Sequence, residues 1–244
     1  MIDIHIHILP GVDDGAKSLS DTLKMARIAA DNGITDIIAT PHCNIPGRYQ
    51  NYFGEAYKNV FWKAANAIKQ ERIPVRLYPG MEVYVTDEVP DLIRQRNLVP
   101  LNCSHYLLVE FNFGEDPGYA DLMLKKIAET GLIPVVAHVE RYHFLQEAPF
   151  MAKRWREKGY VIQVNKASYL GKFGEKEQNT VEFLTEQKWV DVIATDAHSP
   201  RRRTPSMESV YEQLYMDYPD RYLKKLLEDN PRKICMDKPL TIER

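Results

Sequence analysis

The stretch IDIHIHIL, residues 2–9, shows an alternation of period two at the start of the chain. In an extended strand its isoleucines lie on one face, and Asp3, His5 and His7 lie on the other. Two imidazoles therefore point in the same direction. A pair of histidines satisfied within the core is the alternative interpretation, and the rest of the sequence separates the two.

Further short apolar runs follow this strand, with helical segments between them. Six of them lie at residues 35–40, 75–85, 106–111, 133–138, 161–165 and 191–198. Several are rich in Val and Ile with little polar alternation, which is typical of a parallel sheet covered by helices. Strands that alternate with helices imply right-handed crossovers and predict either an open doubly wound sheet or a closed α/β barrel.

Two of the connecting segments carry clear helix signals. After the first strand, Ser18 or Ser20 is a candidate N-cap and Gly33 a candidate residue just beyond the C-cap. After the fourth strand, Pro117 suits the first helical turn and Gly131 closes the helix. The stripes predicted to be buried are Leu19, Leu23, Ala26 and Ala30 in the first helix, and Ala120, Met123, Leu124 and Ile127 in the second.

Length and composition narrow the class of protein. The 244 residues suit one α/β barrel, and no linker or repeat divides them, so we expect a single domain over residues 1–244. The 32 basic and 34 acidic residues leave a net charge of -2, which favours no nucleic-acid partner. No apolar run could span a bilayer, no signal peptide is visible, and three separated cysteines lack a CxxC pair. We expect a cytoplasmic protein without membrane insertion.

Side chains with metal-binding chemistry end or follow most of the predicted strands. The carboxyl ends of parallel strands in an α/β fold meet on one face, so residues far apart in sequence become neighbours there. Imidazoles and carboxylates without thiolates suit Mn²⁺, Fe or Zn²⁺. One ion cannot use this many ligands and keep an open position, so two or three ions are expected. The nine candidates are His5, His7, Asp14, His42, Glu82, Glu110, His138, Asp196 and His198, which leaves only His105 and His143 outside the pattern among the histidines.

The sequence resembles the polymerase and histidinol phosphatase (PHP) superfamily in an ordered set of motifs. Its length and motif order are similar to the metal-dependent tyrosine-protein phosphatases of Gram-positive capsule and exopolysaccharide systems. The resemblance extends from Met1 to about Met207 and implies a distorted (β/α)7 TIM-like barrel, the PHP fold, with three metal ions that are commonly manganese. The motifs are IDIHIHILPGVDDGA (2–16), ATPH (39–42), PGMEV (79–83), the Glu that nearly ends YLLVEF (106–111), HVER (138–141) and DAH (196–198).

The resemblance assigns the candidate ligands to individual ions. One ion would be held by His5, His7, Glu82 and Asp196. Glu82 would bridge to a second ion held with Glu110 and His138, and the third would be held by Asp14, His42 and His198.

The resemblance also implies that two arginines bind phosphate. One is Arg141 of HVER, and the other follows DAH, where Arg203 fits the spacing best and Arg201 and Arg202 are alternatives. A solvated basic loop is the other interpretation of these three consecutive arginines.

Three residues depart from the family pattern. Ile6 stands where a small or polar residue often separates the two histidines. Val139 replaces a proline, and Cys43 stands where a second histidine often follows ATPH. None of these changes removes a candidate ligand.

Cys43 also belongs to the stretch HCNIPGR, residues 42–48, which looks at first like the phosphate loop of a cysteine phosphatase. Such loops resemble C-x5-R, whereas only four residues separate Cys43 from Arg48 here. Pro46 also lacks the amide hydrogen that a phosphate cradle would use. We therefore expect Cys43 to pack as a small apolar side chain and His42 to be the functional residue.

Together these features predict a protein-tyrosine phosphatase in which a metal-bridging hydroxide attacks phosphotyrosine. From the resemblance, the expected substrate is a bacterial tyrosine kinase that regulates capsule or exopolysaccharide synthesis. The alternatives are a small-molecule phosphatase such as histidinol-phosphatase, or a metal-binding regulatory domain without turnover. The sequence leaves the oligomeric state open.

The aromatic segment RYQNYFGEAYKNVFW, residues 48–62, has two interpretations. It is either a helix that buries Tyr52, Ala56, Val60 and the stem of Lys63, or a rim that receives a peptide around phosphotyrosine.

Overall fold

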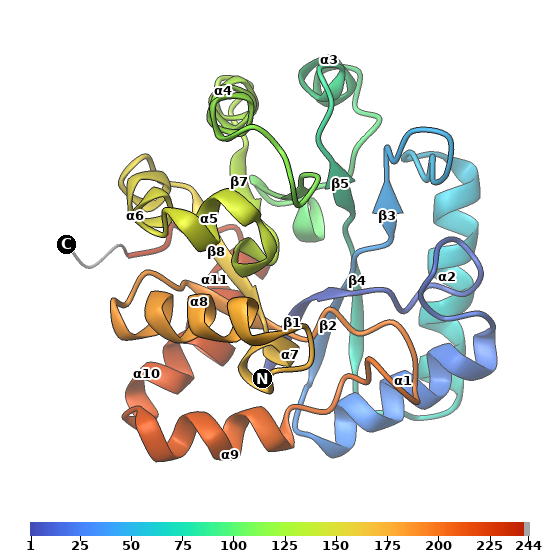
Figure 1. Cartoon of the computed structure of the whole chain (residues 1–244). Coiled ribbons are helices and arrows are strands. Elements are labelled where there is room, and N and C mark those ends of the chain that lie inside the picture. Colours follow the sequence, from blue (N-terminus) through green and yellow to red (C-terminus); the bar gives the residue numbers. More distant parts are fainter. Residues whose placement is uncertain (242–244) are drawn as a thin grey trace.

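The computed structural model describes residues 1–241 and has a mixed α/β fold, with strands in the middle and helices around them (Figure 1). Every strand pair in this part of the chain is parallel. The strand segments are β1 (Ile2–Ile6), β2 (Asp36–Ala39), β3 (His42–Cys43), β4 (Arg76–Pro79), β5 (Glu82–Tyr84), β6 (Tyr106–Glu110), β7 (Ile133–Val136), β8 (Val161–Asn165) and β9 (Val192–Ala194).

The strands form two ladders, each a set of hydrogen-bonded parallel strands. One has the order β1-β2-β4, and the other has the order β3-β5-β6-β7-β8-β9. The chain passes from one ladder to the other twice within a short distance. Only two residues separate β2 from β3, just after the second apolar run, and only two separate β4 from β5, within the third. At the second break, a Cβ on Gly80 would lie 2.7 Å from the side chain of Ile38, so the strands can approach this closely only because Gly80 has no side chain.

The end of the last strand meets the first strand. Ile6 pairs in parallel with Ala197, and the backbone N–H of His7 donates to the carbonyl of Ala197 at 2.9 Å. The parallel strands therefore curl into a half-barrel, and the chain's first and last strands supply adjacent residues at its carboxyl-terminal rim.

Helices cover the outside of the curled sheet (Figure 1). They are α1 (Leu19–Asp31), α2 (Glu55–Gln70), α3 (Val89–Arg94), α4 (Pro117–Ala128), α5 (His143–Glu147), α6 (Phe150–Glu157), α7 (Lys166–Tyr169), α8 (Glu175–Glu186), α9 (Glu208–Asp217), α10 (Asp220–Lys224) and α11 (Asn230–Cys235). Within residues 1–241, none of these helices is long and apolar enough to cross a membrane.

The predicted ends of α1 and the buried stripe of α4 are confirmed. Ser18 caps α1 by accepting a hydrogen bond from the backbone N–H of Asp21, and Gly33 follows its C-cap with a φ of 75°. Pro117 begins α4. The buried residues of α4 are the four predicted, Ala120, Met123, Leu124 and Ile127.

The buried faces predicted for α1 and α2 are confirmed only in part. Helix α1 buries Thr22, Met25, Ala26 and Ala29, so of the predicted stripe Ala26 is fully buried and Leu23 and Ala30 are partly buried against the core. Of the residues predicted for α2 and its preceding loop, Tyr52 and Val60 are partly buried against the core. Helix α2 buries Tyr57, Phe61, Ala64, Ala67 and Ile68, while Ala56 and Lys63 are exposed. The physical reason in α2 is that Tyr57 and Phe61 remove more apolar surface from water than Ala56 and Val60 would.

Candidate metal centre

Glu82, buried on β5, lies at the centre of a cluster of four histidines. Its Oε1 is 2.9 Å from Nε2 of His138 and 3.1 Å from Nε2 of His5. Its Oε2 is 3.0 Å from Nδ1 of His42 and 3.2 Å from Nε2 of His7. One carboxylate therefore contacts imidazoles from the first, second and fifth apolar runs.

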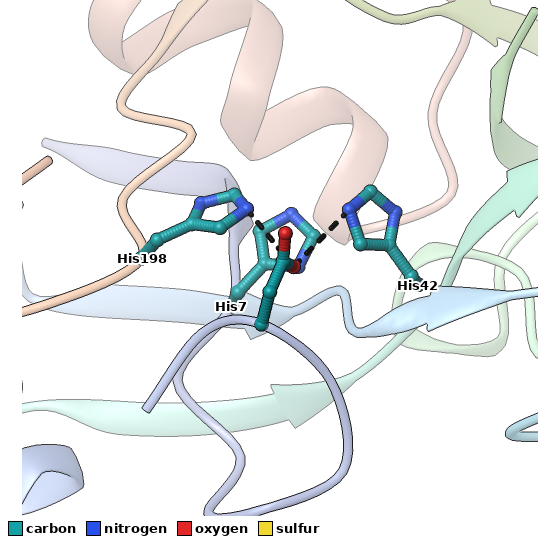
Figure 2. Close-up of side chains that lie close together, drawn as sticks. His7, His42 and His198 are labelled. Carbon is teal, nitrogen blue, oxygen red and sulfur yellow. Dashed lines mark ion pairs between the residues drawn. The ribbon is translucent and has the colours of Figure 1, made fainter. Parts of the chain in front are cut away.

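Asp14 joins three histidines on the outer side of this cluster. Its Oδ1 lies 3.5 Å from Nε2 of both His42 and His198. Figure 2 shows the ring of His7 between those of His42 and His198, and its centroid lies 4.4 Å from the first and 3.8 Å from the second. The Asp14 side chain is 37% exposed, so this side of the cluster reaches solvent.

Asp196, two residues after β9, and Glu110, the last residue of β6, complete the cluster. Oδ1 of Asp196 lies 3.5 Å from Nε2 of both His5 and His7. Oε1 of Glu110 lies 2.9 Å from Nδ1 of His42. The structure therefore brings all nine candidate ligands together at the carboxyl ends of the strands.

Three groups of donor atoms within the cluster are each compact enough to hold an ion. In each group the atoms lie within 4.8 Å of one another. The groups differ from the expected assignment in three ways. His7 also joins the outer group, His42 takes the place of His138 beside Glu82 and Glu110, and Glu82 is absent from the group of His5, His7 and Asp196. The groups are His7, Asp14, His42 and His198; His5, His7 and Asp196; and His42, Glu82 and Glu110.

Buried atoms without hydrogen-bond partners indicate that a cation fits this cluster. Within residues 1–241, six buried side-chain atoms have no hydrogen-bond partner, and five of them belong to the candidate ligands. An unsatisfied buried polar atom costs about 1–3 kcal/mol, and the three carboxylate oxygens among the five, on Asp14, Glu82 and Glu110, lie where cations held by the cluster would ligate them. These five are Oδ1 of Asp14, Nδ1 of His42, Oε2 of Glu82, Oε1 of Glu110 and Nδ1 of His138.

The imidazoles and carboxylates shift one another's ionisation. Burial lowers the pKa of His42, but the charge of Glu82 and the adjacent carboxylate of Glu110 outweigh burial and raise it to about 10. Burial likewise lowers the pKa of His138, which Glu110 and Glu82 raise to about 9. In the opposite direction, burial raises the pKa of Glu82, but His5 and His42 hold it well below its usual range. The cluster therefore keeps its carboxylate charges, which protons balance until a cation replaces them.

Asp13 orients His7, and the sequence reasoning missed it. Nδ1 of His7 lies 2.7 Å from Oδ2 of Asp13, and the same oxygen accepts a hydrogen bond from the backbone N–H of His42 at 3.0 Å. A carboxylate behind a histidine in this way fixes which ring nitrogen faces a metal. The loop can return to His7 because Gly15 has no side chain, since a Cβ there would lie 2.2 Å from the carbonyl oxygen of His7. The available signal was the first aspartate of GVDDG, which directly precedes Asp14.

Arg141 and Arg203 both reach Asp196 beside the cluster. Nη1 of Arg141 is 3.9 Å from Oδ2 of Asp196, and Arg203 forms an ion pair with the same oxygen. The guanidinium of Arg141 also lies 4.1 Å from the ring centroid of Phe113 and 4.5 Å from that of Phe173. Aromatic faces and one carboxylate therefore hold the two cations side by side.

Of the three consecutive arginines, only Arg203 lines the cavity in front of the cluster. This cavity has a volume of about 310 Å³ and is also lined by Arg141, Arg48 and Tyr84. Arg201 and Arg202 are exposed, and their backbone N–H groups donate to Oγ of Ser199.

Cys43 is buried behind the cavity. None of its surface is exposed, and burial raises the pKa of its thiol to about 12. The thiol therefore stays protonated at neutral pH, and the expectation that Cys43 packs as a small apolar side chain is confirmed.

The two remaining histidines lie away from the cluster, as expected. His105 pairs with Asp237 at the surface, with Nδ1 2.8 Å from Oδ2. His143 begins α5 and lines a different cavity.

Fold and site together define an α/β protein whose curled parallel strands carry, at their carboxyl ends, a His and carboxylate centre able to bind metal. The chain belongs to the capsular polysaccharide synthesis family CpsB/CapC, whose family model matches residues 1–236. The resemblance to the PHP-type capsule proteins that the sequence motifs indicated is thereby confirmed.

Relatives of known name cover nearly the whole chain. The tyrosine-protein phosphatase YwqE of Bacillus subtilis is 37% identical over 212 residues, which span 86% of this chain and 83% of YwqE. The tyrosine-protein phosphatase CpsB of Streptococcus pneumoniae is 30% identical over 97% of this chain and 99% of its own length.

A solved structure is similar over its full length. It comes from a set of crystal structures of YwqE from Bacillus subtilis and CpsB from Streptococcus pneumoniae, which are described as "unique metal-dependent tyrosine phosphatases". It has 31% sequence identity to this chain and a TM-score of 0.89, and the match covers 100% of both chains.

Proposed function

We propose that this chain is a metal-dependent tyrosine-protein phosphatase, which hydrolyses phosphotyrosine in a protein substrate. The observation that carries the proposal is the cavity in which two arginines stand beside a cluster of buried, unsatisfied ligand atoms. In such a site the two arginines can bind a phosphate, and the buried atoms can ligate metal ions, within one cavity. Relatives that share at least 30% of their residues with this chain are named tyrosine-protein phosphatases, which supports the substrate class.

We further propose the following finer features of the enzyme. The fold is a distorted barrel of seven βα units, in which β2 and β3 count as one strand and β4 and β5 count as another. The centre holds two or three divalent ions, most simply manganese. The substrate is the tyrosine kinase of a capsule or exopolysaccharide system, which would be met in the cytoplasm.

The donor atoms suit ions with mixed nitrogen and oxygen ligands. We assign His5, His7, Glu82 and Asp196 to one ion and Glu82, Glu110 and His138 to a second. Asp14, His42 and His198 belong to the third, and the central position of Glu82 suits a bridging role. Bound divalent ions would supply a nucleophilic water of lowered pKa and would offset charge on the phosphate.

The protein's own residues bind and orient the phosphate. Arg141 and Arg203 present guanidinium groups at one wall of the cavity, where they stabilise negative charge that grows on the non-bridging oxygens. Asp196 and Phe173 contact both arginines and keep them in place before substrate binds. A phenolate leaves with a pKa of about 10, so the reaction places little demand on a general acid.

Phosphate release by manganese-loaded protein tests the proposal directly. We expect turnover of a phosphotyrosine peptide to exceed turnover of histidinol phosphate. Arg203→Ala should lower kcat/KM for the peptide by about 100-fold, the usual effect of losing one charge-stabilising donor. Arg201→Ala is the matched control, because Arg201 belongs to the same run and is exposed, and it should behave as the wild type.

The other outcomes of this assay identify the alternatives. Preference for histidinol phosphate would make the protein a small-molecule phosphatase. Metal binding without turnover of either substrate would make it a regulatory metal-binding domain.

A further inference from the structure

Gln163 and Asn165 form a hydrogen-bonded chain behind the metal centre. Both lie on β8 and are fully buried, and neither is a candidate ligand. Oε1 of Gln163 is 2.9 Å from Nδ1 of His5, and Nε2 of Gln163 donates to Oδ1 of Asn165 at 3.0 Å. Nδ2 of Asn165 then donates to Oδ2 of Asp196 at 2.6 Å. The chain therefore connects two residues assigned to the same ion.

The direction of every hydrogen bond in this chain follows from its two ends. At one end the backbone N–H of His138 can only donate, and it does so to Oε1 of Gln163 at 3.0 Å. At the other end the carboxylate of Asp196 can only accept. Both amides are thereby oriented, with oxygen toward His138 and His5, and nitrogen toward Asp196.

This direction determines how His5 presents its ring. Because Oε1 of Gln163 is an acceptor, Nδ1 of His5 must carry the hydrogen that lies between them. Nε2 of His5 is then the ring nitrogen that is left to ligate an ion, and it faces Glu82 at 3.1 Å and Asp196 at 3.5 Å.

The same chain determines how Asp196 presents its carboxylate. Oδ2 accepts from Asn165 and pairs with the two arginines, whereas Oδ1 faces the histidines. The backbone gives little help in holding this orientation. Asp196 and His138 have φ values of 47° and 36°, in the left-handed region that costs non-glycine residues energy. Hydrogen bonds with the side chains of Gln163 and Asn165 on β8 compensate at the two positions.

We propose that Gln163 and Asn165 are positioning residues that set the affinity of the centre for divalent ions, by fixing the ring nitrogen of His5 and the carboxylate oxygen of Asp196 that face the ion. This inference rests on the proposed metal-dependent function. It extends that function to two residues of β8 that do not contact the ion or the substrate.

Titration of metal-free protein with Mn²⁺, followed by calorimetry, tests the inference. Gln163→Met keeps the length of the side chain and removes both the acceptor for His5 and the donor for Asn165. Asn165→Leu keeps the shape of the amide and removes the donor for Asp196. We expect each variant to bind Mn²⁺ about 10–100-fold more weakly than the wild type at the site that His5→Ala abolishes.

Two further variants separate positioning from folding. Gln163→Glu retains an acceptor for His5 and for the backbone of His138, so its affinity should lie between those of the wild type and Gln163→Met. Gln187→Met is the matched control, since Gln187 is exposed at the end of α8, and it should match the wild type. Thermal unfolding of each metal-free variant shows that the comparison is made between folded proteins.

The results also separate this inference from the proposed function. Wild-type affinity in folded Gln163→Met and Asn165→Leu would overturn the inference while leaving the metal centre intact. Absence of Mn²⁺ binding by the wild type would overturn the proposed function itself. If Gln163→Met does not fold, Asn165→Leu decides the inference alone, because it leaves the contacts of Gln163 with His5 and His138 in place and removes the donor for Asp196.

Discussion

Cys43 directly follows the candidate ligand His42, but its thiol is not placed to act as a nucleophile. It is fully buried, and its pKa is raised to about 12 by that burial. We expect Cys43→Ser to retain peptide turnover within about twofold. It should lower the free energy of unfolding by about 1–3 kcal/mol, because a more polar hydroxyl is buried in place of the thiol. Phosphate release and urea unfolding measure the two effects.

A loss of turnover of about 100-fold or more in folded Cys43→Ser would instead indicate cysteine chemistry. Treatment with iodoacetamide gives an independent check. The native protein should lose no activity through Cys43, since the protonated, buried thiol is a poor nucleophile.

Single residues also show what the sequence could and could not predict about the site. The nine candidate ligands were selected because each lies in, ends or follows an apolar run, and an α/β fold collects polar side chains at the ends of its strands. Asp13 was missed because it neighbours Asp14 and nothing in a linear sequence tells which of two adjacent carboxylates faces inward. Gln163 and Asn165 alternate along a buried strand, and that pattern was a usable signal that was overlooked.

Between β3 and α2, the loop that carries Arg48 forms part of the mouth of the cavity. Arg48 is exposed and lies 4.9 Å above the ring of Tyr49, which in turn stacks parallel to His42 with centroids 5.8 Å apart. We expect Arg48→Ala to raise KM for a phosphotyrosine peptide severalfold and to leave kcat unchanged, because Arg48 lines the cavity without touching the cluster.

Steady-state kinetics with the peptide and with free phosphotyrosine measure this effect. Arg94→Ala on α3 is the control, since Arg94 is exposed and pairs only with Asp91 within its own helix. A fall in kcat with unchanged KM would place Arg48 in the chemical step rather than at the mouth.

A buried ion pair joins α6 to the start of β9. Nε of Arg156 donates to both carboxylate oxygens of Asp191 at 3.1 Å, and Oδ2 of Asp191 also accepts from the backbone of Ile162 on β8. We expect Arg156→Met to lower the free energy of unfolding by about 3–5 kcal/mol, because it leaves a buried carboxylate unpaired. Chemical denaturation measures the loss.

Neutralising the unpaired carboxylate of Asp191 should restore part of the lost stability. Asp191→Asn on the Arg156→Met background is therefore expected to be more stable than Arg156→Met alone. The control is Arg154→Met on the exposed face of the same helix, which should change stability little. Equal losses in the two single Arg variants would contradict a special role for the buried pair.

Secondary-structure elements were predicted unevenly for a physical reason. Strands and the buried stripe of α4 were found because apolar runs and period-3.6 spacing are local signals. The faces of α1 and α2 were placed only partly correctly, because both helices have apolar residues on more than one side. Which side is buried there depends on the sheet they pack against, and that surface is not visible in the helix sequence.

At the scale of the whole molecule, the centre must release protons when it binds metal. His42 and His138, with pKa values raised to about 10 and about 9, are protonated at pH 7 in the metal-free protein. Each must lose its proton to ligate, so apparent affinity for Mn²⁺ should rise as pH rises from 6 to 8 and fall as pH falls. We expect more than one proton to be released per protein molecule.

Calorimetry in buffers of different ionisation enthalpy counts these protons. A binding enthalpy that is independent of the buffer would contradict the prediction. Titration of His42→Ala provides the comparison, since it should release fewer protons than the wild type.

The global arrangement was predictable only in part. Alternation of strands and helices indicated an α/β fold, and the motifs indicated the family. The division of two apolar runs between two ladders was not predictable, because it depends on close approaches such as that of Gly80 to Ile38.

The meeting of Ile6 with Ala197 has a consequence for how the protein is made. Candidate ligands lie on both sides of this junction, from His5 to His198. A nascent chain leaves the ribosome N-terminal side first, at about 5–20 residues per second. The candidate ligands of β1 are therefore made before those that follow β9, and the proposed centre can be completed only after the last strand has been synthesised.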